Sequence, residues 1–263
     1  MFYDTHTHST FSFDSTMTME AACDRAVSLG LSGIAFTDHL DINYMRDGSD
    51  CYYDFGEYLE KLEAVRAMYK GRLQVFSGVE IGLQPHVVGD NKQMLAGYEF
   101  DYKIGSTHLI ERLNPYDDEY QQYEPEQRRQ VERYLEEVLK NIRLYDEYCT
   151  VGHFDYLIRY TDFPDNTVHY SDYSEVIDAI FKETVARGLA LEVNTRTYDK
   201  TPLDLKSLKR YKDLGGETVT IGSDAHDTGR IGKGFPAALE LIKACGFKYI
   251  AHYEKMKPVY TKI

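Results

Sequence analysis

Nine side chains with the chemistry of metal ligands stand at or just beyond the ends of short apolar segments. They are His6, His8, Asp14, His39, Glu80, His108, His153, Asp224 and His226. His6 and His8 are two positions apart in an extended segment, so both imidazoles are expected on one face of a strand. Imidazole and carboxylate ligands suit divalent transition metals such as Zn²⁺, Mn²⁺ or Fe²⁺. The sequence therefore predicts a metal site built from distant parts of the chain.

The number of these ligands predicts more than one metal. A single catalytic zinc usually takes about three protein ligands and a water, so nine ligands predict two or three ions, with Glu80 as the candidate bridge. A lone histidine at a strand end is more often structural, but six of the nine histidines share this placement. That joint placement favours metal binding. The other three, His86, His169 and His252, are expected to be ordinary surface or loop residues.

The elements that must position these ligands alternate along the chain. Short β-branched or aromatic segments predict strands at 1–6, 32–38, 73–81, 102–108, 150–155, 189–195 and 217–224. Segments of helical period lie between them, such as 18–30, where Thr18 is the expected N-cap and Gly30 follows the end, and 125–148, with Pro125 in its first turn. The long connections imply parallel strands with right-handed crossovers. They favour a (β/α) barrel, although alternation alone does not exclude an open α/β sheet.

A barrel would explain why the ligand residues fall where they do. The C-terminal ends of all its strands converge on one face, which is where such enzymes assemble their sites. The sequence contains no Pro/Gly/Ser-rich linker and no low-complexity segment that would divide it. We therefore expect residues 1–263 to form a single α/β domain with the metal site at that face.

Composition limits the partners. The formal net charge of −13 disfavours nonspecific nucleic-acid binding, which depends on Lys and Arg displacing counterions. No apolar run approaches the roughly 20 residues needed to span a bilayer, and no secretory signal is evident. The four cysteines are widely spaced and form no CxxC motif, which is typical of a reduced protein. We expect a cytoplasmic protein that binds neither nucleic acid nor membrane; no pattern indicates its oligomeric state.

Six motifs together resemble those of the polymerase and histidinol phosphatase (PHP) superfamily. THTHS, FTDH, GVEIG, GSTH, GHFD and GSDAH occur in this order between Asp4 and His226. The segments GHFDYLIRY and LEVNTR and the chain length are most similar to those of monofunctional histidinol-phosphate phosphatases. The resemblance implies a distorted (β/α)7 barrel of the PHP type, with a trinuclear metal site at its C-terminal face.

The resemblance also implies a distribution of the ligands among three metals. The first metal would be held by His6, His8, Glu80 and Asp224, the second by Glu80, His108 and His153, and the third by His39, His226 and the residue at position 14. Many members of the superfamily have histidine at that last position, where this chain has Asp14. A carboxylate is a harder, anionic ligand, so we expect the third metal to be lost most easily.

Two divalent metals favour the hydrolysis of a phosphomonoester. Coordination lowers the pKa of water to about 7, so a hydroxide held between the metals could attack phosphorus in line. The sequence contains neither a P-loop nor a GxSxG nucleophile elbow. With the resemblance, this chemistry predicts a histidinol-phosphatase that converts L-histidinol phosphate and water to L-histidinol and phosphate in histidine biosynthesis.

Candidate residues for phosphate binding and proton transfer lie near the same strand ends. Arg159 and Arg196 are expected to act on the phosphate, because the planar guanidinium group pairs well with phosphate oxygens. Asn194 and Arg230 are weaker substrate-binding candidates. Asp38 is a catalytic candidate alongside Glu80, although Asp41 or a metal-bound water could equally protonate the leaving group. The ordinary alternative for each arginine is a surface ion pair.

Two other functions remain open at this point. One is another PHP phosphoesterase, either a general small-molecule phosphatase or a nucleotide-directed exonuclease. The other is a non-catalytic metal-binding PHP domain. The acidic composition disfavours the exonuclease, and the complete ligand set favours catalysis.

Overall fold

The computed structural model describes residues 2–115, 126–159, 165, 167–196 and 203–263. Seven parallel strands follow one another in the order β1-β2-β4-β5-β6-β7-β8, and the short β3 pairs with β4. The strands are β1 (Tyr3–Thr7), β2 (Gly33–Phe36), β3 (His39–Leu40), β4 (Gln74–Gly82), β5 (Tyr102–Ser106), β6 (Thr150–Val151), β7 (Ala190–Asn194) and β8 (Val219–Gly222).

The first and last strands of this sheet meet. The backbone N–H of Asp224 donates to the carbonyl of His6 at 2.8 Å, and that of His8 donates to the carbonyl of Ala225 at 2.9 Å. The sheet therefore curls into a nearly closed barrel, which confirms the predicted fold class. The open-sheet alternative is excluded.

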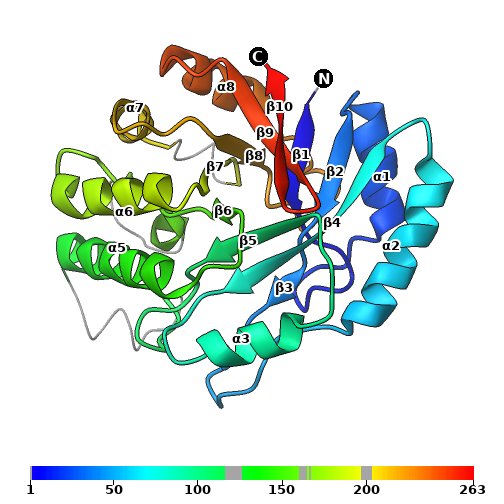
Figure 1. The fold of residues 1–263 in the computed structure, drawn as a ribbon, viewed down its shortest axis with the longest axis horizontal. Coiled ribbons are helices and arrows are strands. Elements are labelled where there is room, and N and C mark those ends of the chain that lie inside the picture. Colours follow the sequence, from blue (N-terminus) through cyan, green and yellow to red (C-terminus); the bar gives the residue numbers. More distant parts are fainter. Residues whose placement is uncertain (1, 116–125, 160–164, 166, 197–202) are drawn as a thin grey trace.

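Helices surround the barrel and connect its strands (Figure 1). They are α1 (Met19–Ser28), α2 (Phe55–Tyr69), α3 (Val88–Leu95), α5 (Gln127–Leu144), α6 (Ser174–Ala186), α7 (Leu205–Asp213) and α8 (Phe235–Ala244), together with the 3₁₀ turn η1 (Tyr156–Arg159). Thr18 caps α1 as predicted, because its side chain accepts a hydrogen bond from the N–H of Ala21 at 3.2 Å. The long helix predicted at 125–148 is α5; Pro125 lies outside the described residues.

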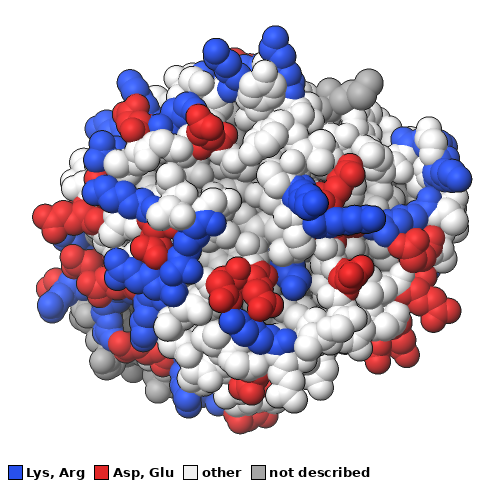
Figure 2. Space-filling model, viewed as in Figure 1, with Lys and Arg blue, Asp and Glu red and all other residues white. Residues whose placement is uncertain are grey.

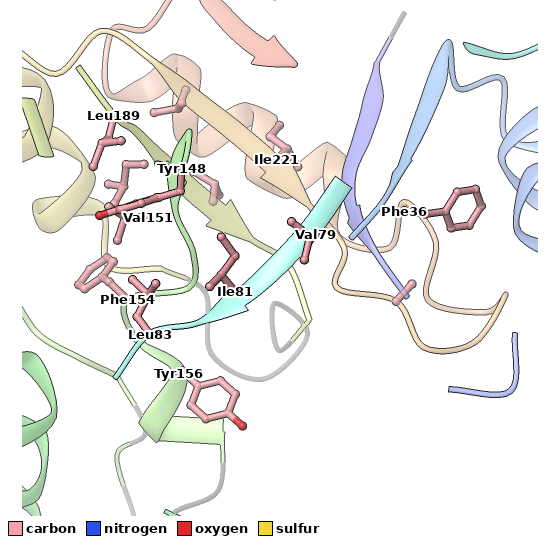
Figure 3. Packing of buried hydrophobic residues seen from close by; sticks show 14 of the residues in the cluster. Phe36, Val79, Ile81, Leu83, Tyr148, Val151, Phe154, Tyr156, Leu189 and Ile221 are labelled. Atoms are coloured by element: carbon pink, nitrogen blue, oxygen red, sulfur yellow. The ribbon is translucent and has the colours of Figure 1, made fainter. Parts of the chain in front are cut away.

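The interior of the barrel is apolar where the strands begin. Inward-facing residues of five strand regions form one buried cluster with Ala251 and Tyr253; the other members are Ala35, Phe76, Tyr102, Ile104, Cys149 and Ala190. The two-residue period of a strand places Phe76 and Glu80 on the same face of β4. The barrel interior therefore changes from apolar to polar along the strands. Phe36, Val79 and Ile81, on the opposite faces of their strands, belong to the larger apolar cluster that also contains residues of the helices; Figure 3 shows these three side chains.

A C-terminal hairpin, which the sequence did not predict, contributes to this apolar layer. Its strands β9 (Tyr249–Glu254) and β10 (Lys257–Lys262) pair antiparallel. His252 was expected at the surface or in a loop, and that expectation is wrong: it lies in β9, is 3% exposed and stacks on Tyr3 with ring centroids 3.7 Å apart. The hairpin buries this segment beneath the barrel. His86 is exposed, and His169 has 43% of its side chain exposed, as expected for surface residues.

All four cysteines are buried and free. Among the described residues, no helix combines the length and the apolar character that crossing a bilayer requires.

One buried tyrosine joins α2 to the place where β2 ends and β4 continues. The hydroxyl of Tyr58 donates to the carbonyl of Phe36 at 2.7 Å and accepts from the N–H of Gly78 at 3.0 Å. The side chain of Tyr58 is fully buried. This hydroxyl therefore bonds two backbone groups at the end of the β2–β4 ladder.

We expect Tyr58→Phe to lower the free energy of unfolding by about 1 to 3 kcal/mol, because it removes two buried hydrogen bonds to backbone groups. Denaturant titration measures this change. Tyr52→Phe is the matched control, since 56% of Tyr52 is exposed. Equal free energies of unfolding of the two variants would show that the Tyr58 hydroxyl does not stabilise the protein.

Candidate metal centre

The structure brings all nine predicted ligands together at the C-terminal ends of the strands. His6, His39 and Glu80 lie on β1, β3 and β4, and the remaining ligands follow β1, β5, β6 and β8; these are His8, Asp14, His108, His153, Asp224 and His226. Most of these side chains are buried, whereas Asp14 keeps 38% of its side chain exposed. The barrel thus positions residues that are far apart in the sequence.

Four of these side chains aim their ligand atoms at one small space. The Nε2 atoms of His6 and His8 are 3.2 Å apart. The Oε2 atom of Glu80 lies 3.3 Å from the first and 3.5 Å from the second. The Oδ1 atom of Asp224 lies 3.3 Å from His8 Nε2 and 3.9 Å from His6 Nε2.

The hydrogen bonds around this space show that it suits a cation. His6 Nδ1 lies 2.7 Å from Glu192 Oε1, and a carboxylate only accepts, so the Nδ1 atom carries the proton and Nε2 a lone pair. Glu80 Oε2 is buried, and no group in the described part of the chain forms a hydrogen bond with it. Lone pairs and carboxylate oxygens that face one another repel unless a cation lies among them. The residues present therefore fit a bound metal.

Glu80 faces a second set of imidazoles with its other oxygen. Its Oε1 atom lies 2.8 Å from His153 Nε2 and 3.2 Å from His108 Nε2, and it accepts a hydrogen bond from Ser106 Oγ at 2.6 Å. His108 Nδ1 lies 2.8 Å from Asp41 Oδ1, so its Nε2 carries the lone pair. The two oxygens of Glu80 therefore face two different ligand groups, as a bridging carboxylate would.

The third group lies nearer to the solvent. His226 Nε2 is 2.9 Å from one carboxylate oxygen of Asp14, and His39 Nε2 is 3.7 Å from the other. His39 also turns its Nδ1 atom toward Glu80 Oε2 at 3.1 Å. His39 thus lies between the third group and the inner ligands, whereas Asp14 faces the Nε2 atoms of His226 and His39.

The electrostatic field of the inner ligands favours positive charge. Burial tends to lower the pKa of His6, but Glu192, Glu80 and Asp224 raise it well above its usual value. Burial tends to raise the pKa of Glu80, yet His6, His108 and His39 hold it well below its usual value. The first shift shows that the surrounding carboxylates attract positive charge, and the second keeps Glu80 in the anionic form that a cation would also stabilise.

Asp224 combines an unusual backbone with several polar contacts. Its φ of 51° lies in the left-handed region, which residues other than glycine rarely adopt. Its Oδ2 atom accepts a hydrogen bond from Arg159 Nη1 at 2.6 Å. Strained backbone of this kind persists where surrounding contacts hold it, and it is common at functional sites.

A pocket opens above these ligands, and two of the predicted arginines line it. Its wall includes Phe13, Tyr44, Tyr156, Arg159 and Arg196 beside the outer ligand residues. The Nη2 atom of Arg159 donates to Asn194 Oδ1 at 2.8 Å. Arg196 lies against His226, with its Nη1 atom 2.6 Å from His226 Nδ1.

Asn194 and Arg230, the other two substrate-binding candidates, lie behind that wall. Asn194 Oδ1 accepts hydrogen bonds from Arg159 and from the backbone N–H of Arg196 at 3.0 Å. Arg230 Nη1 donates to the carbonyl of Arg196 at 2.7 Å. Both residues therefore hold the two pocket arginines in place.

The predicted acid candidates do not line this pocket. Burial raises the pKa of Asp38, and its carboxylate accepts hydrogen bonds from Ser9 and Ser12. Asp41 is 1% exposed and its Oδ1 atom faces His108. The catalytic assignment of Asp38 stays a prediction, and its contacts favour a positioning role.

Sequence reasoning did not select Glu192 as a site residue, although it stands at a strand end as the ligands do. Its Oε1 atom accepts from His6 Nδ1, and its Oε2 atom accepts from the backbone N–H of His153 at 2.8 Å. One carboxylate thus orients ligands on two different strands. The feature of the sequence that could have identified Glu192 is its position near the C-terminal end of β7, where the other site residues also lie on their strands.

Comparison with known proteins gives consistent matches. Residues 4–196 match the model of the PHP domain. The probable histidinol-phosphatase of Clostridium acetobutylicum is 35% identical over 251 residues, which cover 94% of this chain and 95% of that protein. The histidinol-phosphatase of Lactococcus lactis subsp. lactis is 29% identical over 257 residues, which cover 97% of this chain and 95% of that protein.

A solved structure has the same architecture. The crystal structure of histidinol phosphate phosphatase from Lactococcus lactis subsp. lactis, complexed with zinc, L-histidinol and phosphate, superimposes with a TM-score of 0.91. The two chains are 28% identical, and the match covers 98% of each. The putative histidinol phosphatase of Listeria monocytogenes shares the fold, with a TM-score of 0.78 at 18% identity.

We expect Glu80→Gln to lose metal, because an amide replaces one of the two charged oxygens with a hydrogen-bond donor. Elemental analysis of the purified variant measures the loss. Glu137→Gln is the control, since Glu137 is a largely buried glutamate on α5 that pairs with Lys140. Retention of the full metal content by Glu80→Gln would remove Glu80 from the centre.

Proposed function

The chain belongs to the PHP domain family, and we propose that it is a metal-dependent phosphatase that hydrolyses L-histidinol phosphate to L-histidinol and phosphate. One observation carries this proposal: carboxylate oxygens and imidazole nitrogens converge in a buried space that opens into a pocket lined by arginines. The names of the two curated relatives and the zinc, L-histidinol and phosphate of the Lactococcus structure support this substrate. Such a reaction belongs to histidine biosynthesis.

We assign the inner ligands to two zinc ions. His6, His8 and Asp224 would hold one ion and His108 and His153 the other, with Glu80 between them. A third ion would be held by His39, His226 and Asp14, where solvent exposure makes the site weaker. When bound, these metals supply Lewis-acid activation of water and neutralise charge that develops at phosphorus.

The chain's own residues then bind and orient the phosphate. Arg159 and Arg196 offer guanidinium donors from one side of the pocket. Asn194 fixes Arg159, and Arg230 holds the backbone of Arg196. The phosphate would therefore lie between the metals and a pre-organised pair of cations.

The pocket mouth suits a small substrate with a ring. The rings of Phe13 and Tyr44 are 5.5 Å apart between centroids, and Phe13 is 51% exposed. These faces would contact the imidazole of the substrate. On the face shown in Figure 2, basic and acidic side chains are intermixed. That pattern differs from the basic stripe typical of proteins that bind nucleic acid.

Substrate profiling tests this proposal. The zinc-loaded protein is incubated with L-histidinol phosphate, with p-nitrophenyl phosphate and with a single-stranded oligonucleotide. We expect kcat/KM to be highest for L-histidinol phosphate, with activity lost on chelation and restored by Zn²⁺. Equal rates on both phosphomonoesters would indicate a general phosphatase, and release of nucleotides would indicate an exonuclease. No turnover by metal-loaded protein would favour a non-catalytic domain.

We expect Arg159→Ala and Arg196→Ala each to lower kcat/KM for L-histidinol phosphate by about 100-fold to 1000-fold, because each removes a charged donor to the phosphate. Arg159→Lys and Arg196→Lys should lower kcat/KM less, since lysine keeps the positive charge but cannot donate two parallel hydrogen bonds to the phosphate. Steady-state kinetics and metal analysis are measured on the same samples. Arg187→Ala, which removes an ion pair with Glu183, is the control for general destabilisation. Unchanged kinetics in all four site variants would leave phosphate binding to the metals.

A further inference from the structure

The segment between β1 and α1 is anchored to a buried carboxylate beneath it. Asp38 Oδ1 accepts hydrogen bonds from the backbone N–H of Ser9 at 2.6 Å and from Ser12 Oγ at 2.8 Å. Asp38 Oδ2 accepts from Ser9 Oγ at 2.8 Å. Asp38 is fully buried, and Ser12 is 4% exposed. These bonds hold the start of the segment that carries Asp14.

The hydroxyl of Ser12 has three polar neighbours whose roles are fixed by chemistry. It lies 2.8 Å from Asp38 Oδ1, 3.2 Å from the backbone N of His39 and 3.0 Å from His8 Nδ1. A serine hydroxyl donates one hydrogen bond and accepts two. The carboxylate takes the donated bond and the N–H of His39 fills one acceptor position. His8 Nδ1 must therefore be a donor, which leaves the lone pair of its ring on Nε2.

We propose that Ser12, held by Asp38, is a positioning residue that keeps the proton of His8 on Nδ1 and aims the Nε2 lone pair at the inner metal position. This inference rests on the proposed function only in assigning His8 to a metal. His6 and His108 obtain the same tautomer directly from the carboxylates of Glu192 and Asp41. For His8, the effect is indirect. Asp38 accepts the proton of the Ser12 hydroxyl, and the hydroxyl oxygen therefore accepts a hydrogen bond from His8 Nδ1.

The hydrogen bonds from Asp38 through Ser12 to His8, called the relay below, also link two strands at the site. The same Ser12 hydroxyl that accepts from His8 accepts from the backbone of His39, at the start of β3. One side chain thus fixes the ring of one candidate ligand and the backbone of another. Partners of this kind typically alter metal affinity by about 10-fold to 100-fold when they are removed.

The test is chelator competition for Zn²⁺ by Ser12→Ala and the matched control Ser9→Ala. Ser9 lies in the same segment and bonds the same carboxylate. Its hydroxyl donates to Asp38 and accepts from the N–H of Phe11, and no imidazole of the described residues forms a hydrogen bond with it. We expect Ser12→Ala to weaken Zn²⁺ binding about 10-fold to 100-fold. Ser9→Ala should change it by less than about 3-fold, well below that range. Equal weakening in both variants would overturn the relay and leave only support of the segment.

A second pair of variants keeps the test decisive if Ser12→Ala does not fold. Ser12→Thr and Ser12→Val have the same shape, and only the threonine retains the hydroxyl. We expect the threonine variant to bind Zn²⁺ more tightly than the valine variant at similar melting temperatures of the chelator-treated proteins. Equal affinities would overturn the proposal. Since these measurements need no substrate, failure to hydrolyse L-histidinol phosphate would count against the proposed function and not against the relay.

Discussion

The site depends on one electrostatic constraint, which is the gathering of carboxylates and lone-pair nitrogens in a buried space around Glu80. Glu80, Asp224, Glu192 and Asp41 are each at most 3% exposed. Burying an ionised carboxylate costs several kcal/mol unless an opposite charge compensates it. Arg159 provides part of that compensation through Asp224. A bound cation would supply the rest, so metal binding and stability of this end of the barrel are expected to be linked.

The barrel meets this constraint by dividing its interior into two layers. Phe76 and Tyr102 fill the end where the strands begin, and Tyr253 of the C-terminal hairpin packs among them. The polar ligands occupy the other end, on the same inward faces of the strands. The apolar layer closes the site from below, and the pocket lined by Arg159 and Arg196 opens on the other side. A low local dielectric strengthens every charge interaction within the site.

The positions of the ligands could be predicted from the sequence because the C-terminal ends of the parallel strands in a barrel lie on one face. Once His6, Glu80 and Asp224 were assigned to strand ends, their convergence followed from the barrel. The C-terminal hairpin could not be predicted in the same way, since β10 is mostly exposed and its burial of His252 depends on docking beneath the barrel. Asp38 looked like an acid from its neighbours in the sequence; only its bonds to Ser9 and Ser12 indicate a positioning role.

The imidazoles of the site differ in whether their neighbours fix the tautomer of the ring. His6 and His108 each face a buried carboxylate, and His8 faces a hydroxyl held by one. His226 instead places its Nδ1 atom between Arg196 and the carbonyl of Asp224, so no single tautomer satisfies both neighbours. Its other nitrogen faces the half-exposed Asp14. The neighbours of His6, His8 and His108 therefore fix the tautomers of these rings, whereas the neighbours of His226 do not.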